Sequence, residues 1–207
     1  MTRVLIIGGI AAGMKAAATA RRRQPDLDIL VLQDEPEVSY SACGLPFSLG
    51  DPAAIPRAKS VARSVERFRT DGIDLRVRHR VEEVDLSARR ARVRSVVSGE
   101  LSAEPFDQIL FATGAQAIQP RMPVAEGAPP VLPLRSLADA DRLRGLIRPD
   151  GRAVIIGGGY IGRSRRSRFV LCSSLFTGFR PCASHRRTGA EGMRILASRM
   201  IAMEMRV

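Results

Sequence analysis

The sequence predicts an α/β fold with a doubly wound parallel sheet, a small antiparallel insertion and the start of a second domain of the same kind. Three observations carry this prediction. An apolar run within residues 3–7 leads into a pair of glycines, and residues 152–156 repeat this signal before a second glycine cluster. Residues 11–23 are rich in alanine, and another apolar run follows them. Strand, glycine turn, helix and strand in this order are typical of a Rossmann-like nucleotide-binding domain.

The first half of the chain divides into elements by composition. Residues 3–7 and 27–32 predict strands that are buried on both faces of a parallel sheet. Residues 11–23 predict the helix between them, which ends before Pro25. Residues 35–56 contain four prolines and predict a segment rich in loops, and residues 60–70 predict a helix.

The second half begins with strands. Residues 73–84 and 90–97 alternate apolar and polar side chains and predict antiparallel strands, and residues 108–112 predict a further apolar strand. Residues 119–133 are rich in proline and predict a linker. Residues 136–147 predict a helix that Ser136 caps, with Asp139 in its first turn.

The net charge of +12 is distributed unevenly along the 207 residues. Residues 163–207 hold 10 of the 33 basic side chains and 2 of the 21 acidic ones, so they carry +8 of the excess. Because the basic excess belongs to this end and not to a folded module, no nucleic-acid partner is expected for the rest of the chain.

The three cysteines are too few for a disulfide framework. No apolar run approaches the roughly 20 residues of a membrane helix, and the N-terminal apolar run has no cleavage pattern behind it. We therefore expect a cytoplasmic protein without a membrane partner, in which thiols stay reduced unless they take part in chemistry. No metal site is predicted.

The first glycine cluster predicts a site for a pyrophosphate. The loop reads Gly8-Gly9-Ile10-Ala11-Ala12-Gly13, so it matches G-x-G-x-x-G except at Ile10. A strand that leads into a helix N-terminus presents backbone N–H groups to an anion, and small residues let a phosphate approach. The alternative is a tight turn that binds nothing. The ribose-binding position, at the end of the second strand, falls on Gln33 and then Asp34, which are also ordinary turn residues.

Cys43 stands alone among small residues, before Gly44-Leu45-Pro46, about ten residues after the second strand. If it opens a short helix, the helix N-terminus favours the reactive thiolate. The alternative is an inert, buried cysteine. The spacing alone does not decide between the two.

Residues 1–162 resemble the FAD-dependent pyridine nucleotide-disulfide oxidoreductases, and more narrowly their coenzyme A-disulfide reductase and NADH oxidase/peroxidase branch. Residues 4–14, 39–47, 112–115 and 154–162 carry the resemblance, in the family's order. The element Ser-x-x-x-Cys-Gly-Leu-Pro, which begins at Ser39, is specific to members with one redox cysteine.

The resemblance implies that electrons pass from NAD(P)H through FAD to Cys43, which reduces a small disulfide, such as coenzyme A disulfide, or an oxygen species. It assigns the FAD site to Gly8, Gly9, Ala11, Ala12, Gly13, Gln33, Asp34, Thr113 and Gly114. It assigns the NAD(P)H site to Gly157, Gly159 and Gly162.

The resemblance also implies a binding face for coenzyme A. Lys15, Thr19 and Arg22 share one helix face by their spacing, and with Ser39 they fall where the reductases hold coenzyme A. The alternative is a solvated helix face. Ala42, where some reductases have asparagine, leaves the substrate open.

The resemblance stops at about residue 162. The full G-x-G-x-x-G of residues 157–162 is followed by Arg-Ser-Arg-Arg-Ser-Arg in place of the family's helix. We therefore expect an FAD-binding domain over 1–118, a linker and helix over 119–150 and the start of an NAD(P)H-binding domain over 151–162. Residues 163–207 form a divergent basic tail, expected to be disordered or poorly packed and hypothesised to come from a frameshift or an unrelated joined end.

The leading function is therefore an FAD-dependent oxidoreductase in truncated form, with an incomplete NAD(P)H site. The family forms homodimers, and its dimerisation domain is absent from this sequence. One alternative is a non-catalytic remnant of such an enzyme. A weaker alternative is a basic nucleic-acid-binding protein.

Overall fold

A computed structural model describes residues 1–118, 123, 125–128, 130–148, 152–156 and 202–206. The chain divides into two units. The first comprises Met1–Ala42 with Arg57–Ile118, and the second comprises Cys43–Pro56 with Gln119–Val207. The predicted NAD(P)H-binding residues Gly157, Gly159 and Gly162 lie outside the described residues, as does the predicted tail except for one short strand.

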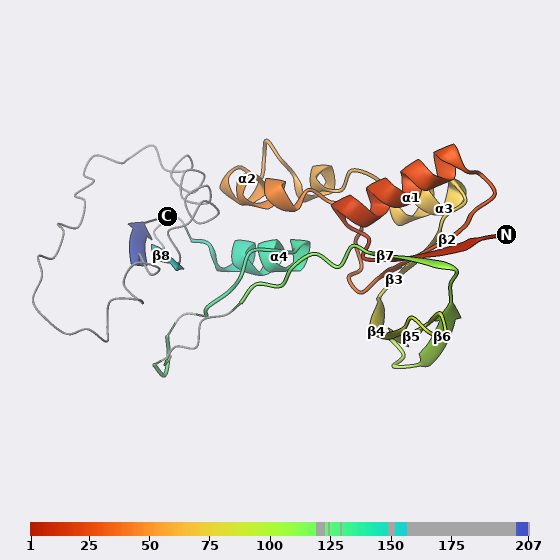
Figure 1. The fold of residues 1–207 in the computed structure, drawn as a ribbon. Helices are drawn as coiled ribbons and strands as arrows, with labels where there is room; N and C mark the ends of the chain where they lie inside the picture. The colour runs from red at the N-terminus through yellow and green to blue at the C-terminus, as the bar shows by residue number, and fades with distance from the viewer. Residues whose placement is uncertain (119–122, 124, 129, 149–151, 157–201, 207) are drawn as a thin grey trace, which may run out of the picture. The chain divides into compact units, whose positions relative to one another are not determined.

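The first unit is built on a four-stranded parallel sheet (Figure 1). Its strands are β1 (Arg3–Ile7), β2 (Asp28–Gln33), β3 (Asp74–Val77) and β7 (Gln108–Phe111), in the order β3-β2-β1-β7. Leu5 of β1 stands opposite Leu30 of β2 and Ile109 of β7. The predicted parallel sheet is thus confirmed, and its strands all end at the same edge.

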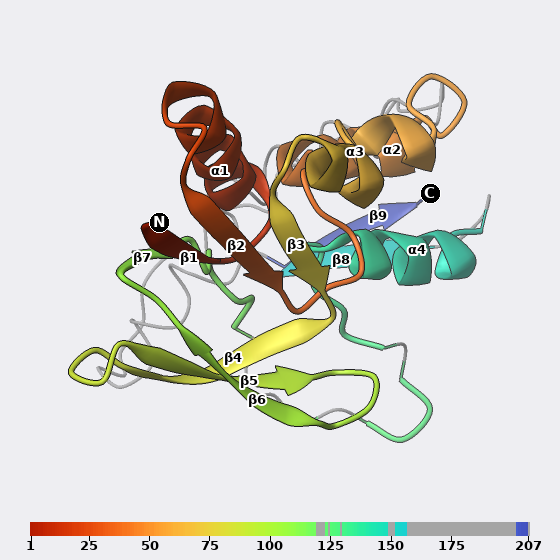
Figure 2. The same cartoon turned by 90° about the vertical axis from the view of Figure 1, so that its right-hand side faces the viewer.

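Helices cover one face of this sheet (Figure 2). They are α1 (Ala11–Arg23) and α3 (Val65–Thr70). Ile6 and Val31 pack in one core cluster with Met14 of α1 and Phe68 of α3. Helix α1 has the predicted bounds, but the predicted 60–70 helix is shorter. It begins only after Ser64, whose hydroxyl accepts the N–H of Arg67 at 3.3 Å and caps the helix.

An antiparallel three-stranded sheet covers the other face (Figure 2). It consists of β4 (His79–Asp85), β5 (Arg90–Ser95) and β6 (Leu101–Pro105). Leu5 and Leu30 pack there with Ala91, Val93 and Phe106 in a second core cluster. Because alternate residues of a strand point to opposite faces, consecutive apolar residues of β1 and β2 serve both clusters.

One part of the strand prediction is wrong. Residues 73–84 do not form a single antiparallel segment, because β3 pairs in parallel with β2 whereas β4 pairs antiparallel with β5. The chain changes sheets at Arg78, which has a φ of +57°. His79 follows it, and the Nδ1 atom of His79 lies 2.7 Å from the carbonyl oxygen of Val77. Strand β6 was not predicted.

The second unit contains the 3-10 turn residues Cys43 and Gly44, α2 (Leu45–Gly50), α4 (Leu137–Leu146), β8 (Arg152–Ile156) and β9 (Ala202–Arg206). The predicted cap of α4 is confirmed. The Ser136 hydroxyl accepts the N–H of Asp139 at 3.1 Å, and the Asp139 carboxylate accepts the N–H of Ser136 at 2.9 Å. Strand β8 pairs antiparallel with β9.

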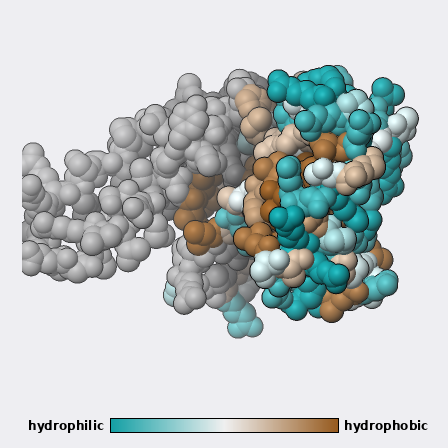
Figure 3. Space-filling view, turned by 45° about the vertical axis from the view of Figure 1, so that its right-hand side comes forward, coloured by the Kyte–Doolittle hydropathy of each residue, from teal (hydrophilic) through white to brown (hydrophobic). Residues whose placement is uncertain are grey.

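No helix among the described residues has the length and apolar character needed to span a membrane. Figure 3 shows a face on which apolar patches are interrupted by hydrophilic residues. Leu110 and Phe111 of β7, the edge strand of the parallel sheet, are 39% and 56% exposed.

Candidate functional site

Two predicted glycines of the first loop are required by close backbone contacts. Gly8 has a φ of +105°, and a Cβ atom there would lie 2.3 Å from the carbonyl oxygen of Ala112. A Cβ atom on Gly13, in the first turn of α1, would lie 1.8 Å from the carbonyl oxygen of Gly8. The loop therefore folds tightly between the end of β1 and the start of α1.

The first turn of α1 is open to an anion. Its N-cap residue is Ile10, which provides no side-chain cap, and the first turn contains no acidic residue. Ala11 and Ala12 at this end are exposed. The N–H groups of an uncapped first turn need an acceptor, and a phosphate group is a suitable one. The residues predicted to bind a pyrophosphate thus lie together at an uncapped helix start, and the binding itself stays a prediction.

The loop is tied to the end of β2. The N–H of Gly8 donates to the carbonyl oxygen of Leu32 at 2.8 Å, and the N–H of Gly9 donates to Oε1 of Gln33 at 2.7 Å. Gln33 is 4% exposed. Its neighbour Asp34 is exposed, and its Oδ2 lies 3.2 Å from Nη2 of Arg80. The two residues predicted at the ribose position therefore differ in what their side chains contact.

Thr113 follows β7 next to the glycine loop. The N–H of Ala112 donates to the carbonyl oxygen of Ile7 at 2.8 Å, and a Cβ atom on Gly8 would lie 3.3 Å from the backbone nitrogen of Thr113. Gly114 has a φ of +67°. Segments about 100 residues apart in sequence, residues 8–13 and 113–114, thus meet at the carboxyl edge of the parallel sheet, where ligands of open α/β sheets bind.

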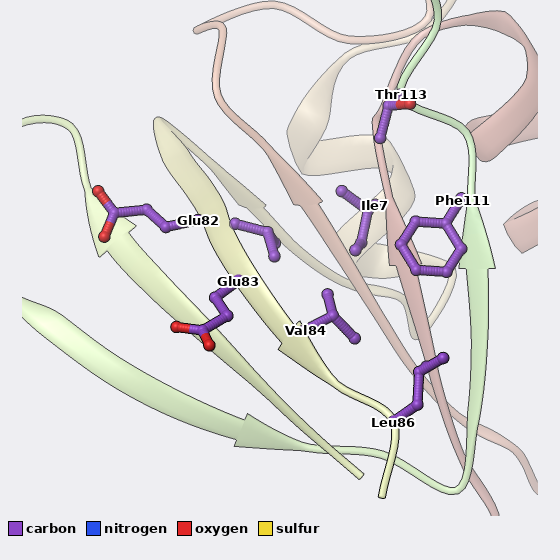
Figure 4. Close-up of a pocket in the computed structure, with 8 residues that line it drawn as sticks. Ile7, Glu82, Glu83, Val84, Leu86, Phe111 and Thr113 are labelled. Carbon is purple, nitrogen blue, oxygen red and sulfur yellow. The ribbon is translucent and has the colours of Figure 1, made fainter.

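A groove that the sequence did not predict lies between β4 and the ends of β1 and β7. Figure 4 shows Ile7, Val84 and Phe111 lining it, with the carboxylates of Glu82 and Glu83 directed away from Phe111. The remaining lining residues are Val81, Leu86 and Thr113. The only sequence signal for it is the apolar alternation of β4, which does not distinguish a groove wall from a core strand.

The two glutamates beside the groove are paired with arginines of β5. Nε of Arg94 lies 2.6 Å from Oε1 of Glu82, and this hydrogen bond lowers the pKa of Glu82 below its ordinary value. Nη1 of Arg92 lies 2.9 Å from Oε2 of Glu83. The groove is therefore lined mainly by apolar side chains and Thr113, and its two glutamates form ion pairs with arginines.

Cys43 is exposed and lies in the 3-10 turn Ala42–Gly44, which leads directly into α2. Pro46 stands in the first turn of α2, a position that needs no N–H donor. The expectation that Cys43 opens a short helical segment is therefore confirmed in outline. The alternative of a buried cysteine is wrong, because the side chain is accessible.

Ser39, four residues before Cys43, is anchored to the glycine loop. It has a φ of +52°, its N–H donates to the carbonyl oxygen of Gly9 at 2.9 Å, and its own carbonyl oxygen accepts the N–H of Ala62 at 2.9 Å. A non-glycine residue in this conformation is uncommon and is held by its surroundings. The segment before Cys43 is thus fixed at its start.

The other three predicted substrate residues lie on α1. Lys15 and Arg22 are exposed, and Thr19 is half-buried. Arg22 lines a shallow pocket with Arg21 and Arg63, but Arg21 donates to the carbonyl oxygen of Gly72 at 2.6 Å and Arg63 pairs with Asp71 at 2.9 Å. The remaining lining residues are Ala18, Asp71 and Ile73. The face of α1 that carries these residues is accessible, which fits both a coenzyme A-binding face and a solvated helix face.

The described residues contain no group of three or more histidine, cysteine, aspartate or glutamate side chains arranged to hold a metal ion.

Known proteins are similar to this chain in sequence. A "NAD(P)H sulfur oxidoreductase (CoA-dependent)" of Pyrococcus abyssi is 34% identical over 179 residues, covering 81% of this chain and 36% of the relative. A coenzyme A disulfide reductase of Staphylococcus aureus is 23% identical over 189 residues, covering 90% of this chain and 41% of the relative. The chain therefore spans about two fifths of the length of these relatives.

Solved structures agree with these matches. The reduced CoADR-RHD of Bacillus anthracis superposes with a TM-score of 0.72 and 26% identity, covering 82% of this chain and 31% of that one. A water-forming NADH oxidase of Lactobacillus brevis, bound to NADH, has a TM-score of 0.75 and 23% identity, with 83% and 38% covered, and supports the fold alone. Residues 2–164 match the sequence profile of the pyridine nucleotide-disulphide oxidoreductases, and the chain therefore belongs to that family.

Proposed function

We propose that this chain binds FAD at the glycine loop of the first unit and uses it to reduce a small substrate through Cys43. The observation that carries the proposal is the uncapped first turn of α1 behind the close-packed glycines Gly8 and Gly13. These glycines allow close backbone packing at the start of α1, where the uncapped N–H groups suit a pyrophosphate. Thr113 and Gly114 contribute the second segment at the same edge.

Bound FAD would supply the two-electron relay between NAD(P)H and a thiol. The residues of this chain have separate tasks in the proposal. The first turn of α1 holds the pyrophosphate, and the end of β2 holds the ribose. Gly157, Gly159 and Gly162 hold NAD(P)H, although they lie outside the described residues. Lys15, Thr19, Arg22 and Ser39 are proposed to hold a substrate that carries phosphate groups, such as coenzyme A.

The proposed chemistry of Cys43 is thiol–disulfide exchange. The thiolate attacks one sulfur of a substrate disulfide, forms a mixed disulfide and releases the other half as a thiolate. Two electrons from NAD(P)H then cleave the mixed disulfide, which restores the Cys43 thiolate and releases the second half; one proton is consumed when both products leave as thiols. With hydrogen peroxide as the substrate, the thiolate instead takes up one oxygen and becomes sulfenic acid, and the other oxygen leaves as water after it accepts a proton. Two electrons and a proton, supplied as hydride by NAD(P)H, then reduce the sulfenic acid to the Cys43 thiolate and release a second water.

The names of the relatives support the disulfide substrate. The Staphylococcus aureus relative is a coenzyme A disulfide reductase, and that of Pyrococcus horikoshii, 33% identical, is a coenzyme A polysulfide/persulfide reductase. The NADH oxidase of Enterococcus faecalis, 23% identical, keeps an oxygen species as the alternative substrate. The exposure of Cys43 suits either substrate.

The test uses the full chain and its Cys43→Ser variant, both loaded with FAD. We expect NAD(P)H to bleach the flavin absorbance in both proteins, and coenzyme A disulfide to restore it only in the chain that retains Cys43. Restoration in the Cys43→Ser variant at the same rate would contradict the proposed role of the thiol. Restoration by peroxide and not by the disulfide would assign the oxygen-species substrate.

A second candidate is a non-catalytic remnant that binds FAD without turnover. Residues 163–168, Arg-Ser-Arg-Arg-Ser-Arg, stand where the resemblance predicts the family's helix, and this divergence favours considering it. The same experiment separates the two candidates, because the remnant would bind FAD and show no bleaching with either NADH or NADPH.

A further inference from the structure

Two adjacent polar residues, Gln33 and Asp34, stand at the end of β2, where Rossmann-like folds hold the ribose of a nucleotide. At this position an acidic side chain ordinarily accepts hydrogen bonds from the ribose of the bound nucleotide. Here the residue is Gln33, and its side chain is directed into the protein, with 4% of the residue exposed. Oε1 of Gln33 accepts the N–H of Gly9 at 2.7 Å in a buried hydrogen bond.

The N–H and the carbonyl oxygen of Gly9 both form hydrogen bonds within the protein. Its N–H is held by Gln33, and its carbonyl oxygen accepts the N–H of Ser39. A Cβ atom on Gly9 would lie 3.0 Å from Cβ of Gln33 and 3.1 Å from Cγ1 of Val38, so the packing is also tight. The Gln33 amide thus fixes the path of the loop before any ligand is present.

A neutral amide suits this buried position. A carboxylate would lose its hydration there and would need further donors to offset the loss. The amide oxygen needs only the one N–H that Gly9 provides. Removing the acceptor would leave that N–H buried and unsatisfied, which is the costly half of a lost hydrogen bond.

Asp34, the next residue, is placed differently. It is exposed, and its Oδ2 lies 3.2 Å from Nη2 of Arg80. Its Oδ1 lies 3.5 Å from Nε2 of Gln33, at the outer limit of a hydrogen bond. A carboxylate accepts at about four positions, so these contacts leave capacity for the hydroxyl groups of a ribose.

We propose that Gln33 is a positioning residue of the glycine loop and that Asp34 is the acceptor for the adenosine ribose. The inference rests on the proposed FAD site and specifies its residues. If the assignment holds, a mutation of Gln33 changes the geometry of the glycine loop, and a mutation of Asp34 removes the contact with the ribose.

The test compares the affinities of the cofactor-free full chain for FAD and for FAD that lacks the 2′-hydroxyl of the adenosine ribose. Wild type is expected to bind FAD about tenfold more tightly than the cofactor without the 2′-hydroxyl, because one charge-assisted hydrogen bond is lost. Asp34→Ala should bind both cofactors equally. Gln33→Met, which keeps the length of the side chain and removes the acceptor, should weaken both by the same factor and keep the tenfold preference. Asp26→Ala, which removes an exposed acid before β2, is the matched control.

A second readout needs no cofactor. Amide hydrogen exchange of Gly9, followed by NMR, should be slow in wild type, faster in Gln33→Met and unchanged in Asp34→Ala. If Gln33→Met fails to fold, wild type still tests the role of Gln33, because fast exchange of Gly9 there would show that no hydrogen bond holds its N–H. The cofactor preference of Asp34→Ala still tests the ribose contact.

Two results would overturn the assignment. One is a preference for FAD that disappears in Gln33→Met and persists in Asp34→Ala, because it would place the ribose on Gln33. The other is slow Gly9 exchange in Gln33→Met. If wild type bound neither cofactor, the FAD proposal and the ribose role of Asp34 would both be wrong, and the Gly9 exchange rates would still decide the role of Gln33.

Discussion

Arg144 of α4 donates a hydrogen bond to Ser48 of α2, with 3.2 Å between Nη2 of Arg144 and Oγ of Ser48. The two residues are 96 positions apart in the sequence. The Ser48 hydroxyl in turn donates to the carbonyl oxygen of Ile55 at 2.9 Å, and Ser48 is 2% exposed. This buried hydroxyl therefore joins α4, α2 and the loop that follows α2, five residues after Cys43.

Ser48→Ala should destabilise this part of the second unit by about 1 kcal/mol, because the Ile55 carbonyl and the arginine lose a buried partner. Hydrogen exchange of the backbone in residues 45–56 should rise, while that of the first unit stays as in wild type. Arg142→Ala, which truncates an exposed arginine of the same helix α4, serves as the control and should leave these rates unchanged. Equal rates in wild type and Ser48→Ala would contradict the structural role of the hydroxyl.

Gly13→Ala should destabilise the first unit by about 3 kcal/mol or more and abolish FAD binding, because the new Cβ atom would meet the backbone oxygen of Gly8 at 1.8 Å. Chemical denaturation measures the loss. The matched control is Gly145→Ala in α4, where an added Cβ atom meets nothing within 4 Å. There the substitution should be neutral or stabilising by up to about 1 kcal/mol, since alanine favours helix. Similar effects at both sites would refute the close contact at Gly13.

The pair of Glu82 with Arg94 predicts a pH-dependent contribution to stability. The pKa of Glu82 is lowered below 4.5 in the folded chain, chiefly by its hydrogen bond with Arg94, so the folded state binds fewer protons than the unfolded state. The contribution is present above pH 4.5 and is lost as the pH falls through the lowered pKa. Arg94→Gln should thus be less stable than wild type at pH 7, and the difference should shrink as the pH falls below 4.5.

Thermal unfolding of wild type and Arg94→Gln between pH 3 and pH 7 measures this difference. Arg23→Gln removes the same charge from an exposed position at the end of α1 and controls for net charge. A difference between wild type and Arg94→Gln that stays constant over this range would show that Arg94 acts by packing and not through the ionised glutamate.

The exposure of Cys43 predicts a reactive thiol in the folded chain. In a chain with Cys172→Ser and Cys182→Ser, we expect one thiol to react with a chromogenic disulfide without denaturant, and none after the further change Cys43→Ser. Exchange with coenzyme A disulfide, followed by mass spectrometry, would identify the mixed disulfide. A thiol that reacts only after unfolding would contradict the accessible position of Cys43.

The sequence predicts much of the parallel layer because its signals are local. The apolar residues of β1 and β2, the alanines of α1 and the capping residues Ser136 and Asp139 each act within a few positions, and their elements appear as predicted. The split of residues 73–84 between two sheets was not predictable in this way. Alternation is the same in both sheets, and the partner of each strand is chosen by packing over distant residues.

In the candidate site, too, some features follow from the sequence and others only from the tertiary structure. The sequence by itself determined the fold class, the glycine loop, the family and the isolated position of Cys43, because each depends on residue type and spacing. Only the tertiary structure decided that the Gln33 side chain turns inward to Gly9 while Asp34 stays exposed. Two adjacent polar residues look alike in a sequence, but Gln33 is buried against the glycine loop and Asp34 is exposed, so the packing around each side chain gives it its contacts.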